Sequence, residues 1–542
     1  MIAWCVSLLW VAQGCNVTPE GQPAGAMALP RHLGQISPAN LHAETTQPAV
    51  TVEQATETMA GEVLQASALP SLSLDIATAR AWALEGNLEL KVQRVEPSIV
   101  AQEVRFEKGR FEPRFRGLAS YSRRDGGGQD SDDYGLAPSV RVPLKTGGEV
   151  SAGPGFEWDE QERGDSTALD AGFSFSQPLL RDAGVKVNTA GIRIAGLDWE
   201  IAGARTKLRI IRTLAEVDRA YWELYAAQQE LRVARQQYEL AQTQIQQVRK
   251  RVEAGSAPRI EIIRAESGVA ARLQGIIVAQ TLVRRREREL KRLMNRPDLP
   301  VDSATEILIA TVPDPVGLAM DAKRLLEQAL AERMELLVLE LELAVDEELV
   351  AQRRNALLPG LDLSVEYGRR GVGNRFNQAL RRLNDDGADE LLVEAMLDVP
   401  LGNQQAQARL RRARLERFQR LLSKRDQELA ITQDVYDALD RFQESWRQIV
   451  VARRGVIVAT ENYRAEQRQF ELGLRTSIEV LDAATRLAQA QLSEIGALAD
   501  YEISKVDLAV ATGTLLGQDG VCWEPVELDE ADKAVAPTTQ PG

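Results

Sequence analysis

The chain has 542 residues, of which 44% are hydrophobic, 27% charged and only 5% aromatic, a composition typical of a folded protein with long helices rather than thick globular cores. Its formal net charge of −14 disfavours a nucleic-acid partner, because phosphate backbones require a basic footprint. Both histidines, His32 and His42, lie in the N-terminal stretch, and the three cysteines are widely scattered, which excludes histidine metal sites, Ser–His–Asp triads and zinc clusters from the rest of the chain. We therefore expect neither an enzyme nor a cofactor.

The N-terminus predicts export from the cytoplasm. Residues 1–15 are uncharged and mostly apolar, which is typical of a secretory signal and too short for a membrane-spanning helix. This segment ends in Ala12-Gln13-Gly14-Cys15, which is similar to a bacterial lipobox, so Cys15 is the candidate for lipidation. A plain signal peptide with an incidental cysteine is the alternative.

Two further segments lack a sustained apolar period. Residues 16–70, rich in Pro, Ala, Thr and Gln, predict a linker, and residues 518–542 predict an acidic flexible tail. Beyond Pro70 no run of apolar residues reaches the length of a spanning helix. A membrane role would therefore require a β-barrel or a lipid anchor.

The chain between these segments is duplicated. A shift of 246 positions pairs Glu89 with Glu335, Pro113 with Pro359 and Tyr121 with Tyr367, and a shift of 218 pairs Gly255 with Gly473 and Glu261 with Glu479. We expect a first repeat over 71–300, a linker over 301–320 and a second repeat over 321–517. Because the offset between the repeats falls from 246 to 218, the first repeat must contain extra residues, and we expect most of them in its strand region.

Each repeat predicts a pair of long helices, over about 190–254 and 259–294, then 404–472 and 476–512. Apolar residues recur every seven positions in the first helix of each pair, as in a coiled-coil seam: Ile210, Val217, Leu224, Leu231, Tyr238, Ile245 and Val252, then Val435, Phe442, Ile449, Val456, Tyr463 and Phe470. At ~1.5 Å per residue the first of these helices would be ~95 Å long. Such a length fits a rod or a structure that crosses a compartment.

The segments of about 114–178 and 361–399 predict strands, because apolar and polar residues alternate there. Leu169, Ala171, Phe173 and Phe175 alternate with polar or small residues. Such strands fit a transmembrane barrel or a soluble sheet that lies on the helices. The clustering of aromatic residues between Phe111 and Phe175 favours the barrel, since aromatic side chains form girdles at membrane surfaces.

A further hairpin is expected near residues 136–158. The turn Lys145-Thr146-Gly147-Gly148-Glu149 carries a Gly-Gly signal. Pro138, Pro143 and Pro154 predict that its strands are weak or lie at an edge, because proline cannot donate to the hydrogen-bond ladder.

Three motifs resemble those of one known family. They are Gln177-Pro178-Leu179-Leu180-Arg181, the junction from Phe470 to Asp482, and its weaker first-repeat counterpart from Glu253 to Glu261. Over residues 72–517 the chain resembles the TolC-like outer membrane factors, the exit ducts of tripartite efflux pumps and type I secretion systems.

The resemblance implies a mainly α fold with a membrane β-barrel part. Three protomers would share one outer-membrane barrel, continued into the periplasm by a twelve-helix barrel. The partners implied are a periplasmic adaptor protein, an inner-membrane transporter and outer-membrane lipid. Protomers of the family normally supply four strands, so the hairpin at 136–158 either adds strands or extends a loop.

The resemblance also implies site residues at the helix–helix junctions. Gly255, Gly473, Leu474 and Thr476 mark the tips to which the adaptor docks. Glu479 and Asp482 match two acidic pore rings, which favour cations. Arg475 and Glu261 match a pair that bonds between neighbouring hairpins, and our hypothesis is that this pair holds the tip shut. The alternative for all four charges is a solvated helix surface.

The predicted function is a passive, non-enzymatic export duct that is gated at its periplasmic tip. Two alternatives remain: a periplasmic coiled-coil lipoprotein with a structural role, and a periplasmic adaptor of the same pumps. A rod would not require amphipathic strands, and adaptors normally have one coiled-coil hairpin rather than two repeats.

Overall fold

The computed structural model describes residues 70–124, 131–161 and 166–518. Contacts divide the chain into Met1–Gln65 and Ala66–Gly542, and all described residues belong to the second unit. The predicted signal peptide, the lipidation candidate Cys15, almost all of the linker over 16–70 and almost all of the acidic tail lie outside the described residues.

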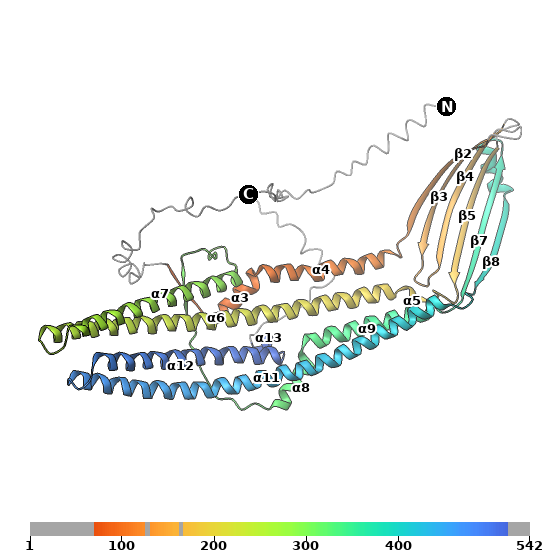
Figure 1. The fold of residues 1–542 in the computed structure, drawn as a ribbon. Helices are drawn as coiled ribbons and strands as arrows, with labels where there is room; N and C mark the ends of the chain where they lie inside the picture. Colours follow the sequence, from red (N-terminus) through yellow and green to blue (C-terminus); the bar gives the residue numbers. More distant parts are fainter. Residues whose placement is uncertain (1–69, 125–130, 162–165, 519–542) are drawn as a thin grey trace, which may run out of the picture. The chain divides into compact units, whose positions relative to one another are not determined.

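Four long helices dominate the described chain (Figure 1). They are α6 (Ala190–Glu253), α7 (Ile260–Met294), α11 (Gln404–Glu471) and α12 (Ser477–Ala511). α6 packs on α7, α11 on α12, and α12 on α6. The heptad seam explains this packing, because Val217, Leu224 and Val435 are fully buried. The long helices expected from the sequence are confirmed.

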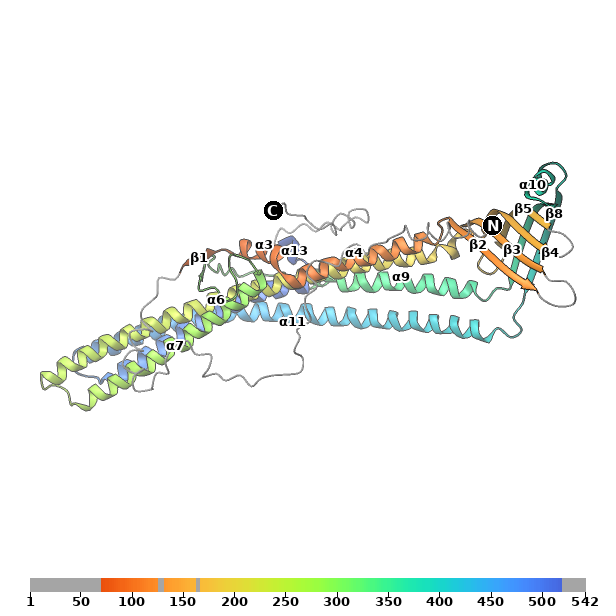
Figure 2. The same ribbon diagram turned by 90° about the horizontal axis from the view of Figure 1, so that it is seen from above.

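Shorter helices line the other half of α6 and α11. They are α3 (Ile76–Gly86) and α4 (Leu88–Gly109) in the first repeat, and α8 (Ala322–Glu332) and α9 (Met334–Asn355) in the second. α4 packs on α6, and α9 packs on both α6 and α11 (Figure 2). Two single-turn helices, α5 (Val185–Asn188) and α13 (Leu515–Gln518), and a parallel pair of short strands, β1 (Ser71–Leu74) with β6 (Glu306–Ile309), complete this part.

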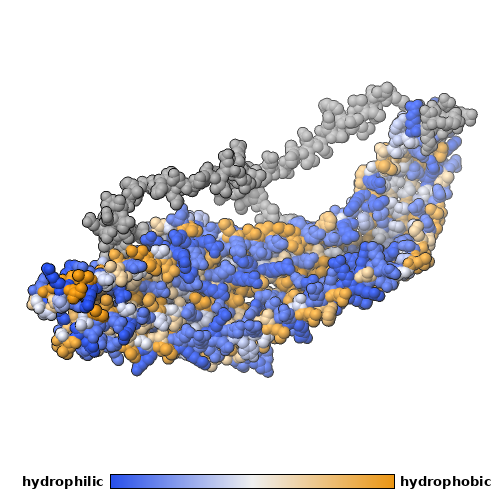
Figure 3. All heavy atoms as spheres, viewed as in Figure 1, coloured by the Kyte–Doolittle hydropathy of each residue, from blue (hydrophilic) through white to orange (hydrophobic). Residues whose placement is uncertain are grey.

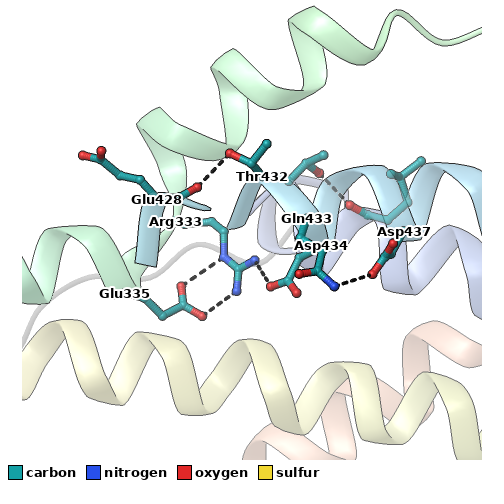
Figure 4. A network of polar contacts seen from close by, with 9 residues as sticks. Arg333, Glu335, Glu428, Thr432, Gln433, Asp434 and Asp437 are labelled. Carbon is teal, nitrogen blue, oxygen red and sulfur yellow. Dashed lines mark hydrogen bonds and ion pairs between the residues drawn. The ribbon is translucent and has the colours of Figure 1, made fainter. Parts of the chain in front are cut away.

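Buried charges hold the short helices against the long ones. Arg80 of α3 donates two hydrogen bonds, of 2.7 and 2.8 Å, to the fully buried carboxylate of Asp218 on α6. Burial raises the pKa of Asp218, and the hydrogen bonds from Arg80 only partly offset this effect. In the second repeat, Arg333 at the start of α9 donates to both carboxylate oxygens of Glu335 and to Asp434 of α11 (Figure 4).

Beyond the ends of α4 and α9 lies one antiparallel sheet of six strands (Figure 1). The strands are β2 (Arg114–Arg124), β3 (Ser131–Pro143), β4 (Glu149–Gln161), β5 (Ser166–Pro178), β7 (Gly360–Gly373) and β8 (Ala388–Asp398), and they neighbour one another in this order. The antiparallel sheet expected from the sequence is confirmed. The extra hairpin adds two strands, β3 and β4, to the sheet, and Gly147 in its turn has a φ of +94°.

The prolines of this hairpin do not make it an edge, so the expectation of edge strands was wrong. β3 and β4 lie inside the sheet, between β2 and β5. Their pairing is interrupted only between Leu136–Phe156 and Val140–Ala152, and the register is the same on both sides of the gap. Pro138 and Pro154 both fall in this gap, so the two missing donors coincide in one place. Gly153 permits the close approach there, because a Cβ atom would lie 2.1 Å from the carbonyl oxygen of Pro138.

A short helix, α10 (Phe376–Asp385), packs on β7 and β5. Its close approach requires glycine on the strand, since a Cβ atom at Gly371 would lie 2.4 Å from the carbonyl oxygen of Ala379. The ring of Phe376 lies 6.0 Å from that of Phe156. Among the helices that the structure describes, none combines the length and apolarity needed to cross a membrane.

Candidate functional site

The two turns between the long helices have the same construction. α6 ends at Gly255, with a φ of +68°, and α11 ends at Gly473, with a φ of +77°. In each turn the glycine N–H and the next N–H bond back to carbonyls of the last helical turn, at 2.9–3.0 Å. This is a Schellman motif, which requires the left-handed backbone that glycine adopts without strain. The duplicated glycines are therefore helix stops that turn the chain back on itself.

The second turn continues into a capping box. The backbone N–H of Thr476 donates to the Glu479 carboxylate at 2.7 Å, while the Thr476 side chain caps α12 in return. Arg475 donates to the same carboxylate at 2.7 Å. The hydrogen bond from the Thr476 backbone, followed by that from Arg475, lowers the pKa of Glu479. Glu479 thus stabilises the start of α12 as an ionised side chain.

The predicted pair between Arg475 and Glu261 is not formed within the chain. Arg475 instead bonds inside its own hairpin, to Glu479 and Gln469 at 2.7 and 2.8 Å, and forms an ion pair with Glu466 at 3.3 Å. The Glu261 carboxylate is bound by Arg264, one turn along α7 at 2.7 Å. Local partners three to nine residues away therefore satisfy both charges, which a motif comparison does not reveal.

Other side chains join the two hairpins instead. The guanidinium of Arg251 on α6 donates to the carbonyl oxygen of Phe470 on α11 at 2.6 Å and lies 3.8 Å from the centre of the Phe470 ring. The hydroxyl of Ser477 donates to Glu261. Beside these contacts Val248, Phe470 and Val480 form a small buried cluster. The tip of the first hairpin is thereby fastened to the tip of the second.

The sequence did not single out Arg251, although one signal for it was present. A basic residue in the last turn of a helix can bond to free carbonyls at a helix end. Arg251 lies one turn before Gly255, at the junction. The equivalent residue in the second repeat is Gln469, so comparison of the two repeats did not indicate a role for a basic residue here.

The remaining predicted tip residues are exposed. Asp482 pairs with Arg486 one turn away at 2.7 Å, and both side chains are more than half exposed. Leu474 and its neighbour Leu472 are about three-quarters exposed, at 73% and 74%. Two large apolar side chains therefore face outwards on the second turn.

The six-stranded sheet has one apolar face and one polar face. Residues directly opposite on neighbouring strands share a face, as do alternate residues of one strand. By the registers, one face carries Phe115 and Tyr121 of β2, Tyr134, Leu136 and Val140 of β3, Val150, Phe156 and Trp158 of β4, Leu169, Phe173 and Phe175 of β5, Val365 and Tyr367 of β7, and Leu391, Val393 and Leu397 of β8. α10 lies on this apolar face, against Phe156.

The opposite face is mostly polar and hollowed, although Leu118 and Leu392 also lie on it. Small residues such as Ser139, Gly153 and Gly172 line it, together with Arg116, Arg141, Asp170 and Glu366. On the apolar face, rings form a row across three strands: those of Tyr121 and Tyr134 lie 5.1 Å apart and those of Tyr134 and Trp158 lie 5.2 Å apart. This row lies at the end of the sheet that is far from the long helices.

Both edges of the sheet are open. β2 and β8 each pair with a strand on one side only in the described chain. The helices that adjoin these strands expose apolar stripes: Leu88, Val92, Val95, Ile99 and Phe106 on α4, and Leu415, Leu422, Leu429, Tyr436, Val450 and Ile457 on α11. Figure 3 shows apolar residues interspersed with polar ones over the helices and the sheet. The α11 stripe has a period of seven, as in a coiled-coil seam without its partner.

No metal centre accompanies these surfaces. Within residues 70–124, 131–161 and 166–518, no three His, Cys, Asp or Glu side chains are grouped so that they could hold an ion.

Comparison with known proteins gives a family match. The family model described as "Outer membrane efflux protein" matches residues 155–296 and 325–514, so its first match begins within β4. The outer membrane protein TolC of Vibrio cholerae is 26% identical over 204 residues, which are 36% of this chain and 45% of that protein. The chain therefore spans less than half the length of this curated relative.

Solved structures share the fold. The outer-membrane channel OprN superposes with a TM-score of 0.61 at 19% identity, covering 81% of this chain and 90% of that one. The Campylobacter jejuni CmeC outer membrane channel gives 0.62 at 15% identity, covering 85% and 88%. The Neisseria gonorrhoeae MtrE outer membrane channel, in its open state, gives 0.59 at 18% identity, covering 81% and 89%.

Proposed function

Because this chain belongs to the outer membrane efflux protein family, we propose that it is the protomer of a homotrimeric exit duct, passive and non-enzymatic, in the outer membrane. In this proposal an inner-membrane transporter supplies the energy and a periplasmic adaptor protein docks to the tip. The duct serves a tripartite efflux pump or a type I secretion system. The observation that supports the proposal best is that both edge strands of the sheet, β2 and β8, are unpaired on their outer side in the described chain.

These edges suit a closed ring of identical copies. An unpaired strand presents a row of free N–H and C=O groups, which is stable only when another strand or water satisfies it. β2 and α4 form one side of the protomer, and β8 and α11 form the other. If β8 and α11 of one copy meet β2 and α4 of the next, the ladder closes and the apolar stripes on α4 and α11 become buried.

The sheet has the dimensions and polarity of a membrane wall. A tilted transmembrane strand needs about 9–11 residues, and the strands here have 11–14. In a closed barrel the apolar face turns to lipid and the polar, hollowed face to the lumen. The row formed by Tyr121, Tyr134 and Trp158 then lies at one membrane surface, where such rings are favoured.

The tip of the helices is the proposed gate. Arg251 and Ser477 fasten the two hairpins of one protomer, so the tip opens when these contacts break. Three copies of Asp482 and Glu479 around the axis form the proposed acidic rings, and Glu261 and Arg475 lie at the same junctions. The adaptor is proposed to dock at Gly255, Gly473, Thr476 and the exposed Leu474.

The two alternatives fit the sheet less well. A soluble periplasmic rod gains nothing from a six-stranded sheet whose apolar face is exposed, because exposed apolar surface promotes aggregation. A periplasmic adaptor would have one helical hairpin, whereas this chain has two, α6–α7 and α11–α12.

Ion conduction tests the proposal. The full chain, purified in detergent, is added to a planar lipid bilayer, and a heat-denatured sample serves as the control. We expect stepwise conductance of a pore that is nearly closed at rest, and larger steps once the tip contacts are removed. A native preparation that inserts but conducts no ions, even with its tip contacts removed, would contradict a duct.

A further inference from the structure

β3 and β4 are full members of the sheet. β3 forms eleven residue pairs with β2, from Arg114–Arg141 to Arg124–Ser131, and β4 forms eleven with β5, from Glu149–Ser176 to Asp159–Ser166. Each has 13 residues, as many as β5. They separate β2 from β5, so in this structure the sheet is continuous from β2 to β5 only through them.

Their side chains follow the same division of faces as the other strands. On the apolar face β3 carries Tyr134 and Leu136, and β4 carries Phe156 and Trp158. Leu136 is 51% exposed in the isolated protomer, so the described part of the chain leaves about half of it uncovered. A hairpin that folded over a water-filled mouth would have no reason to keep one face apolar along its full length.

On the other face the two strands carry mostly small side chains: Gly135, Ala137, Ser139, Ser151, Gly153 and Gly155. An ion pair of 2.8 Å joins Glu157 of β4 to Arg370 of β7 across the intervening strand β5. The small Ala168 lies beneath this bridge. The polar face is therefore continuous from the added strands to the second repeat.

We propose that this chain builds an eighteen-stranded barrel whose lumen in the membrane is as wide as the helical tube that feeds it. The proposal rests on the homotrimer proposed above, since six strands from each of three protomers give that number. With strands ~4.8 Å apart and tilted by about 40°, eighteen strands close at a radius of roughly 18 Å, and twelve strands at roughly 12 Å.

The helical part matches the wider barrel. Four helices of each protomer, α7, α6, α12 and α11, lie side by side, so three protomers contribute twelve. Twelve helices about 9 Å apart form a ring with a radius of roughly 17 Å. The added hairpin thus removes the step in width that a twelve-stranded barrel would place between the helical tube and the membrane.

The cargo follows from this width. Side chains take up about 5 Å of each wall, half the usual spacing of packed sheets, which leaves a lumen roughly 25 Å across against roughly 14 Å for twelve strands. One helix with its side chains is about 10–12 Å wide. The duct then passes water-soluble cargo wider than a single helix, along a wall that carries Arg116, Arg141, Asp170 and Glu366 among small residues.

The chain offers a matched control for this proposal. Residues 124, 131, 161 and 166 lie at the same end of the sheet, because they pair in sequence from β2 to β5. Deletion of residues 131–161 therefore leaves ends that can rejoin, and β2 then pairs with β5. The deletion variant would have four strands in each protomer.

Electron cryomicroscopy of the unaltered full chain in lipid nanodiscs counts the strands directly. We expect eighteen, and twelve in the deletion variant. In planar bilayers, neutral polyethylene glycols of graded size added on the barrel side lower the conductance when they enter the lumen. The limiting polymer radius should be about 1.8-fold larger for the full chain than for the deletion variant, as the two lumen widths are.

The outcomes separate this proposal from the proposed function. A trimeric barrel of twelve strands, with β3 and β4 outside the wall, overturns the wide barrel and leaves the duct intact. Equal polymer limits for the two proteins also overturn it. A chain that forms no trimeric barrel overturns the duct itself. If the deletion variant does not insert, the strand count of the unaltered chain decides alone.

Discussion

Among the residues of the tip, Arg251 makes two contacts that join the hairpins. It reaches from α6 to the end of α11, where it donates to the carbonyl oxygen of Phe470, which also accepts from the N–H of Gly473, and it covers the Phe470 ring. A guanidinium that bonds to a carbonyl oxygen and stacks on a ring combines a charge-assisted hydrogen bond with a cation–π contact.

We predict that Arg251→Ala loosens the tip and raises the conductance of the reconstituted pore several-fold, because the two hairpins lose this link. Arg249→Ala is the matched control. Arg249 lies two residues away on the same helix, and its pair with Glu266 is exposed on both sides, so its loss has little effect. Equal conductances for the two variants would show that Arg251 does not hold the tip closed.

The capping box at α12 predicts a dependence on pH. Since the pKa of Glu479 is lowered by the Thr476 backbone and by Arg475, its stabilisation of the turn is present above the unfolded value of about 4.5 and is lost as the pH falls through the folded value. Hydrogen exchange of residues 474–480, corrected for the intrinsic effect of pH, should accelerate below about pH 4.5.

Glu479→Gln provides the comparison. Glutamine still reaches back to the N–H of Thr476 but carries no charge, so exchange in this variant should change little with pH. The capping account is wrong if both proteins show the same pH profile.

The tip residues show where motif comparison stops. The spacing from Phe470 to Asp482 identified the junction and its glycine stop, and the structure has a Schellman turn there. The partner of each charge could not be predicted in this way. Arg475 meets whichever carboxylate lies within reach of its flexible side chain, and Glu466 and Glu479 of the same hairpin are the nearest.

At the scale of elements, the network around Arg333 fixes the start of α9 against α11 (Figure 4). Burial alone would raise the pKa of Glu335, but the hydrogen bonds and charge of Arg333 outweigh it and lower that pKa. Without Arg333 the half-buried carboxylate of Glu335 loses its partner.

We predict that Arg333→Ala lowers the free energy of opening of the first turn of α9 by about 1–3 kcal/mol at neutral pH, the usual cost of leaving a buried polar group unsatisfied. Hydrogen exchange of that turn measures this free energy. The difference between the variant and the parent should shrink below about pH 4.5 as Glu335 becomes protonated. Arg412→Ala removes an exposed ion pair on α11 and should change exchange by less than about 0.5 kcal/mol. Equal effects of the two changes would contradict this role.

Elements with a strong period could be predicted from the sequence, and those without it could not. Apolar residues that recur every seven positions, with Val217 in one series and Val435 in the other, predict long helices, because only a helix places such residues on one stripe. β3 and β4 were harder to place. Pro138 and Pro154 suggested edge strands, and only the three-dimensional register shows that both fall in one gap. α10 was not predicted, since its ten residues provide too short a pattern.

At the scale of the whole molecule, the exposed stripes on α4 and α11 are the proposed contacts between copies. Leu422 lies in the α11 stripe between Leu415 and Leu429, opposite the buried face of that helix, and is 55% exposed in the isolated protomer. A seam of this kind is buried only when a second copy covers it.

We predict that Leu422→Glu weakens the trimer, because a carboxylate in the seam would be desolvated without a partner. Ser423→Glu is the matched control, since it adds the same charge one residue later, about 100° around the helix. Native mass measurement in detergent should show protomers for the first variant and the parental assembly for the second. A parental mass for both would place the subunit contact elsewhere.

The sequence predicted the class of molecule more firmly than its assembly. The scarcity of histidine disfavoured a catalyst, the heptads predicted a rod or a structure that crosses a compartment, and the family motifs implied a duct. The number of strands in the barrel depends on whether a hairpin joins the sheet, which is decided by pairing between distant residues such as Phe173 and Tyr367 and cannot be deduced from local alternation.

The central claim is that copies of this chain close their open edges around one lumen. The native mass of the unaltered protein, extracted from outer membranes in mild detergent, tests it most directly. The account predicts three protomers of a chain whose full length has a mass of 59.8 kDa. A protein that remains a single protomer in detergent and leaves the membrane without it would contradict the account.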